Sequence, residues 1–89
     1  MEDLAYPLPI GSIVKYKDWE QLLMIYGRHQ KKGDTGVIWD YVACYYPIGN
    51  ISDQYNLFFN QEGIFEVVFR GYENAQEKEL QAVLVEQKE

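Results

Sequence analysis

The chain has 89 residues, and its 14 acidic and 8 basic side chains give it a net charge of −6 at pH 7 and a pI near 4.6. Hydrophobic residues make up 47% and aromatic residues 16% of the sequence, which excludes an intrinsically disordered chain. No apolar run approaches the roughly 18 residues that cross a bilayer, and the negative charge disfavours nucleic acid as the main partner. The length predicts one domain over residues 1–89.

The start of the sequence differs from a signal peptide. It is acidic and is interrupted by Pro7 and Pro9, whereas a signal peptide begins with basic residues and continues into an unbroken apolar stretch. The single cysteine, Cys44, cannot form an internal disulfide, and no cysteine spacing typical of a metal site is present. Together these features predict a cytoplasmic protein.

Five short segments are typical of β-strands, because they are rich in apolar, β-branched and aromatic residues and are separated by turn residues. The predicted strands cover residues 10–17, 22–28, 37–46, 54–59 and 64–69. Gly27 predicts a bulge or bend in the second strand. The polar segment 30–36 predicts a hairpin loop, and residues 60–63 predict a tight turn or one turn of 3₁₀ helix.

Side chains alternate between the two faces of a strand. In the third predicted strand this rule places four residues on one face: Trp39, Tyr41, Ala43 and Tyr45. In the last predicted strand it places three residues on one face: Phe65, Val67 and Phe69.

The pattern changes to that of a helix after Asn74. Asn74, followed three residues later by Glu77, resembles a capping box. Leu80, Val83 and Leu84 fall at helical spacing and form one narrow apolar stripe. The whole pattern predicts an α+β fold, in which a twisted antiparallel sheet of four to five strands (about residues 8–72) packs with a C-terminal helix (73–88). Strands and loops this short also allow the sheet to curl into a small, partly open barrel.

The residues that most often perform catalysis have no supporting pattern in this sequence. His29 is the only histidine, and Cys44, in the middle of a predicted strand, is typical of a small buried hydrophobe. Asp40 and Glu66 fall within strands, where carboxylates commonly lie on a solvated face. No histidine and carboxylate cluster has metal-ligand spacing. We therefore expect no catalytic residue, no cofactor and no metal.

Two features have a weaker functional interpretation. Residues 27–33 carry glycines and lysines but lack the Gly-Lys-Ser/Thr ending of a phosphate-binding loop. The basic cluster Arg28, His29, Lys31 and Lys32 fits either a solvated hairpin tip or a single-strand nucleic-acid site flanked by tyrosines. The acidic charge of the whole chain favours the hairpin tip.

Aromatic residues exceed the number that one thin core needs, and exposed aromatic patches commonly mark protein interfaces. We therefore expect a partner-binding surface that combines exposed aromatics of the sheet with the apolar stripe of the helix. The candidate partner-binding residues are Tyr41, Tyr45, Tyr55, Tyr72, Leu80, Val83 and Leu84.

Four segments in this order, LPIGSIVKYK, LLMIYGR, DYVACYYPIGN and YNLFFNQEGIFEVVFRGY, make the chain similar to a small domain family of unknown function in Firmicutes, encoded beside type VII (Ess/WXG100) secretion systems. The matching positions, called signature residues below, are Leu8, Pro9, Ile10, Gly11, Ser12, Gly27, Arg28, Asp40, Tyr41, Tyr46, Pro47, Gly49, Phe59, Asn60, Ile64, Val67, Phe69, Gly71 and Tyr72. At Gly63 the chain departs from its relatives, which more often have an acidic residue there.

The resemblance implies a cytoplasmic accessory protein that acts as a chaperone or adaptor for a secretion substrate or toxin, without catalytic residues. Two alternatives remain open: an immunity protein that neutralises a toxin, and a small-barrel binder of single-stranded nucleic acid. Tyr16 and Glu20 match the spacing of a type VII export signal, but the tyrosine falls in a predicted strand and neither Trp19 nor Trp39 precedes x-Gly. The match is therefore interpreted as accidental.

Overall fold

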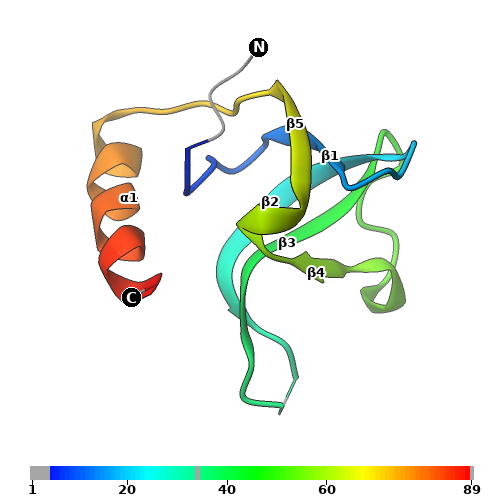
Figure 1. Ribbon diagram of the computed structural model, residues 1–89, viewed down its shortest axis with the longest axis horizontal. Helices are drawn as coiled ribbons and strands as arrows, with labels where there is room; N and C mark the ends of the chain where they lie inside the picture. Colours follow the sequence, from blue (N-terminus) through cyan, green and yellow to red (C-terminus); the bar gives the residue numbers. More distant parts are fainter. Residues whose placement is uncertain (1–4, 34, 89) are drawn as a thin grey trace.

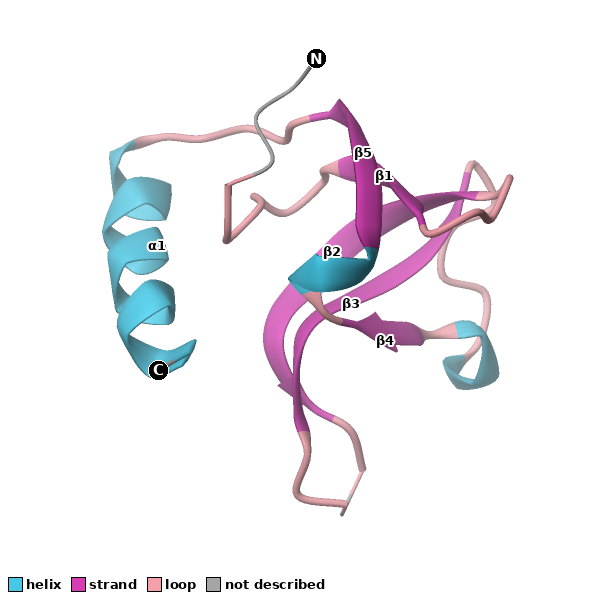
Figure 2. Ribbon diagram, viewed as in Figure 1, coloured by secondary structure: helices cyan, strands magenta, loops and turns pink. Residues whose placement is uncertain are grey.

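The structure is a computed structural model that describes residues 5–33 and 35–88. This part of the chain contains five strands, two short 3₁₀ turns and one α-helix (Figures 1 and 2). In chain order these are β1 Ile13–Tyr16, β2 Leu22–Lys31, β3 Ile38–Tyr46, η1 Asp53–Tyr55, β4 Leu57–Phe59, η2 Gln61–Gly63, β5 Ile64–Phe69 and α1 Ala75–Lys88.

All five strands form one antiparallel sheet in the order β4-β3-β2-β1-β5. The predicted α+β fold is confirmed. The sheet does not close into a barrel, so β4 and β5 are its two edge strands. The last strand along the chain therefore returns to pair with the first, and the two are neighbours in Figure 1.

Three predicted strand boundaries differ from the structure by three residues each. β1 begins only at Ile13, because Ser12 closes a tight turn through hydrogen bonds from its N–H and hydroxyl to the carbonyl of Pro9. β2 continues to Lys31, so the hairpin loop starts later than predicted. β4 keeps only its last three residues, because the segment before it winds into η1.

The prediction that Phe65, Val67 and Phe69 share one face of β5 is wrong. Val67 is 2% exposed, whereas Phe65 is 72% and Phe69 is 55% exposed. The register between β1 and β5 shifts twice, and each shift inserts an extra residue of β5. Two such bulges break the alternation of side chains, so both phenylalanines reach solvent.

The core lies on the face of the sheet that carries Tyr41 and Ala43, with Tyr45 packed against it, as the alternation of the third strand predicts. The remaining fully or nearly buried members of this cluster are Leu8, Val14, Leu23, Ile25, Phe59, Ile64 and Val67. Trp39, the fourth residue of the predicted face, is half-buried.

Tyr41 is a fully buried tyrosine whose hydroxyl forms two hydrogen bonds. It accepts the N–H of Leu8 at 3.0 Å and donates to the side-chain carbonyl of Gln61. Burial raises the pKa of the Tyr41 hydroxyl well above its usual range. The hydroxyl therefore remains protonated and joins the N-terminal segment to η2.

Helix α1 stands beside the sheet, and residues 5–12 lie between the two in Figure 1. The Arg28 guanidinium of β2 donates to Glu77 of α1 at 2.9 Å and to the carbonyl of Leu8 at 3.3 Å. At the other end of the helix, Lys88 pairs with Asp40 at 3.0 Å. Only Leu84 is a buried residue within α1, so polar contacts supply much of its attachment.

The predicted cap of the helix is confirmed in part. The side-chain oxygen of Asn74 accepts the N–H of Glu77 at 2.9 Å. The Glu77 side chain does not complete the box, because its carboxylate is taken by Arg28. Burial alone would raise the pKa of Glu77, but hydrogen bonds from Arg28 and Gln81 outweigh it and lower that pKa.

Candidate protein-binding surface

Two of the seven predicted partner-binding residues are in the interior, which contradicts the prediction for them. Tyr41 is 0% exposed and Leu84 is 7% exposed. Tyr41 points to the core because alternation in β3 puts it beside Ala43, and Leu84 is the helix residue that faces the rest of the molecule. A third, Tyr45, is half-buried against the core.

The other four predicted residues are exposed but do not form one surface. Tyr55 belongs to η1, which lies across the molecule from α1 in Figure 2. Tyr72, in the connection before α1, is 80% exposed, and Leu80 and Val83 lie on an outer side of the helix. The structure therefore separates the predicted set into at least two places.

The most exposed apolar strand is one that the prediction did not single out. Phe65, Val68 and Phe69 of β5 are all exposed, and Tyr72 follows three residues later. One side of β5 pairs with β1, and its other side has no strand neighbour in the described part of the chain. The sequence did not reveal that these side chains are exposed, because the bulges that expose them depend on the pairing of β5 with β1.

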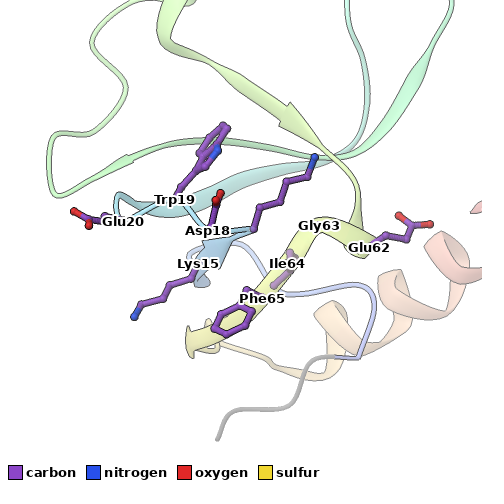
Figure 3. Close-up of a pocket in the computed structure, with 9 residues that line it drawn as sticks. Lys15, Asp18, Trp19, Glu20, Glu62, Gly63, Ile64 and Phe65 are labelled. Carbon is purple, nitrogen blue, oxygen red and sulfur yellow. The ribbon is translucent and has the colours of Figure 1, made fainter.

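An open hollow lies at the beginning of β5 (Figure 3). It has a volume of about 620 Å³ and is bounded by the end of β1, the β1–β2 turn, η2 and the first residues of β5. We call it the Trp19 hollow, and its lining residues are Lys15, Lys17, Asp18, Trp19, Glu20, Glu62, Gly63, Ile64 and Phe65.

The shape of this hollow depends on a close approach between Gly63 and the ring of Tyr16. A Cβ atom on residue 63 would lie 2.1 Å from Cε1 of Tyr16, so a side chain there would displace the ring. The Tyr16 ring also contacts the rings of Trp19 and Phe59, with centroids 5.0 Å away in both cases. Glycine at position 63 is thus matched to the tyrosine beside it.

His29 and Cys44, for which the sequence pattern does not favour catalysis, do not come together. Cys44 lies opposite Met24 in the β2–β3 ladder, whereas His29 is five residues farther along β2, which corresponds to about 16 Å. Cys44 is 2% exposed, and burial raises the pKa of its thiol. This pair therefore has no geometry for nucleophilic catalysis.

A second, polar hollow of about 300 Å³ contains His29 and two carboxylates, those of Asp40 and Glu62. Asp40 already accepts hydrogen bonds from the N–H of Gln61 at 2.9 Å and from Lys88 at 3.0 Å. The described residues include no group of three or more side chains able to hold a metal ion. This hollow is explained by the attachment of α1 to the sheet.

The basic cluster of the β2–β3 hairpin is also divided by the structure. The Arg28 side chain is 5% exposed in its ion pair with Glu77, so it is withdrawn from the surface. Lys31 and Lys32 are exposed, and the ammonium of Lys32 lies 5.6 Å from the ring centroid of Phe58. Two neighbouring lysines on an acidic chain provide little attraction for a phosphate backbone.

Several signature residues bond to one another inside the fold. The Ser12 hydroxyl donates to the carbonyl of Pro9 at 2.7 Å and accepts the N–H of Gly71 at 2.9 Å. The side chain of Asn60 accepts the N–H of Asp40 at 3.0 Å. These positions therefore hold the strands and connections in place, and they do not by themselves mark a binding surface.

The expectation that the chain belongs to a domain family of unknown function is confirmed. The sequence model of a domain of unknown function (DUF4176) matches residues 7–80, so the chain belongs to this family. No curated protein and no solved structure matches the chain. Within residues 5–33 and 35–88, no helix has the length and apolar character needed to traverse a bilayer.

Proposed function

We propose that the protein is a non-enzymatic, cytoplasmic chaperone or adaptor that binds a substrate or toxin of a type VII secretion system. The resemblance to a Firmicutes family encoded beside such systems supports the biological setting. Membership of the domain family supports the resemblance itself but is silent on activity.

The observation that carries the binding role is the exposure of large apolar side chains around β5. Phe65, Phe69 and Tyr72 are each more than half exposed within eight residues of chain, and Trp19 lies on the adjoining hollow. Leaving aromatic rings in water is unfavourable, and exposed apolar patches commonly become covered by a partner. A chaperone or adaptor uses such a surface to hold another protein chain.

Co-expression of the tagged protein with the neighbouring genes of its native locus tests this proposal. We expect a neighbouring toxin or secretion component to copurify in stoichiometric amount. Replacement of Phe65 and Tyr72 by serine should abolish copurification, while replacement of the distant Ile51, which is 63% exposed, should not. If no neighbouring protein copurifies with the unsubstituted chain, the adaptor role is wrong.

The same strains separate the adaptor from an immunity protein. An acidic surface suits an inhibitor of a nuclease toxin, because carboxylates can occupy phosphate positions. If the protein only carries the toxin, cells that express both should survive no better than cells that express the toxin alone. Full protection from the toxin would support the immunity role instead.

A further inference from the structure

We propose that the Trp19 hollow binds a cationic side chain, arginine or lysine, on a basic segment of the partner protein. This inference rests on the proposed function, because it specifies the chemistry of the partner that the β5 surface recognises. It is carried by the aromatic rings and the carboxylates that line one hollow.

The walls of the hollow are suited to the long stem and the charged end of a cationic side chain. Figure 3 shows the Trp19 indole and the Phe65 ring on opposite sides of the lining, and they are 41% and 72% exposed. Arginine and lysine pack their methylene groups on apolar surfaces and place their cationic ends over aromatic rings. A hollow of about 620 Å³ has room for one such side chain and its neighbours.

The charges around the hollow favour a cation over an anion. Asp18, Glu20 and Glu62 lie around its rim, with Glu20 and Glu62 at opposite ends in Figure 3, and within the described residues none of these three carboxylates forms an ion pair. The lining also contains two lysines, and each has a contact within the protein. The Lys15 ammonium is 3.9 Å from the carboxylate of Glu66, and that of Lys17 is 5.3 Å from the Tyr16 ring centroid.

The rest of the molecule reinforces this preference. The net charge of −6 attracts a basic segment and repels an acidic or phosphorylated one. Beyond the hollow, Val68 and Phe69 continue the exposed apolar surface along β5. The occupant is therefore a basic segment that also carries apolar residues, with its arginine or lysine in the Trp19 hollow.

Selection from a library of random 12-residue peptides displayed on phage tests the proposal on the intact chain. The selected peptides should be enriched in arginine or lysine next to apolar residues. In a synthetic copy of a selected peptide, replacing that cationic residue by glutamine should weaken binding about tenfold or more, which corresponds to about 1.4 kcal/mol.

Variants of the protein identify the site. The double variant E20Q/E62Q should weaken binding of that peptide about tenfold, and E20K/E62K should instead favour a peptide in which glutamate replaces the cationic residue. These charge variants are tested beside W19A, because W19A also removes the ring contact between Trp19 and Tyr16 and so lowers stability. The matched control E79Q/E86Q, which removes two exposed carboxylates of α1 outside the hollow, should leave peptide binding unchanged.

Several results would overturn the inference. They are enrichment of acidic or uncharged peptides, failure of the library to yield any binder, and equal binding by E20Q/E62Q and the unsubstituted chain. If the neighbouring protein still copurifies with E20Q/E62Q and W19A but is lost from L80A/V83A, the adaptor role stands and the partner binds α1. If no protein copurifies with any chain, the proposed function itself fails.

Discussion

Gly71 occupies a place where two backbone segments come into close contact. A Cβ atom on this residue would lie 2.3 Å from the carbonyl oxygen of Ile10, and the Gly71 N–H is already bonded to Ser12. The same Cβ atom would lie 3.1 Å from the backbone nitrogen of Ser12, whose N–H is bonded to Pro9, so these backbone atoms cannot move without disturbing the turn. Glycine is required here by space, although it does not need an unusual φ angle.

The substitution G71A should therefore lower the free energy of unfolding by about 2–4 kcal/mol. Urea denaturation followed by circular dichroism measures the change. The matched variant is G63A, where the conflict is with the side chain of Tyr16. A ring can shift more readily than a backbone, so G63A should cost less than G71A. An equal or smaller cost for G71A would contradict this account.

Glu77 makes stability depend on pH, because its pKa is lowered in the folded state. A carboxyl whose folded pKa lies below its unfolded value, about 4.3 for glutamate, stabilises the fold above that pH. The contribution disappears as the pH falls through the folded pKa. Replacing one partner of a largely buried ion pair costs about 3 kcal/mol, so E77Q should be less stable by about that amount at pH 7.

The difference between E77Q and the unsubstituted chain should shrink as the pH falls below about 4 and vanish at lower pH. Free energies of unfolding measured from pH 7 to pH 2 test this course. E79Q, an exposed position on the same helix, should follow the unsubstituted chain throughout. A difference for E77Q that is independent of pH would show that the Arg28–Glu77 pair does not act through its charge.

At the scale of whole elements, α1 is attached by one apolar residue and several polar contacts. Leu84 is 7% exposed, whereas Leu80, one turn before it, is 44% exposed. L84A should therefore cost about 2–3 kcal/mol, while L80A should cost less than about 1 kcal/mol. Urea denaturation of the two variants provides a comparison of the same substitution on the same helix. Equal losses would mean that α1 packs differently.

The sequence contained enough information for the elements and for the core face of β3, but not for the faces of β5 and α1. The helix and its Asn74 cap were predictable because capping depends on neighbouring residues. The same local pattern led to the wrong interpretation of Leu84 as a binding residue. The side of α1 that faces inward depends on contacts with distant residues, among them the ion pairs of Glu77 and Lys88. Bulges in β5 likewise depend on its pairing with β1, a strand far away in the sequence.

The candidate surface was less predictable than the fold for a physical reason. A tyrosine in a strand has the same local pattern whether it is buried, like Tyr41, or exposed, like Tyr46. The Trp19 hollow combines residues of the β1–β2 turn with residues of η2 and β5, which are about 40 positions apart. Such a site becomes visible only when the order of the strands is known.

At the scale of the whole molecule, phenylalanines divide between core and surface. F59S, at a position 2% exposed, should cost about 3 kcal/mol or more, whereas F65S, at a position 72% exposed, should change stability by about 0.5 kcal/mol or less. For a domain of 89 residues, 1 kcal/mol corresponds to a change in Tm of about 4–8 °C. Thermal unfolding of the two variants measures the contrast, and a large drop for F65S would contradict the exposed position.

The bonds between the N-terminal segment and the region around α1 have a consequence for biosynthesis. Ser12 bonds to Gly71, which is synthesised 59 residues later, and Arg28 bonds to Glu77, which is synthesised 49 residues later. The first half of the chain therefore emerges from the ribosome before its bonding partners, Gly71 and Glu77, have been synthesised. Because such distant pairings give a high contact order, we expect completion of the fold to be slow for so small a protein and to occur after translation has passed α1.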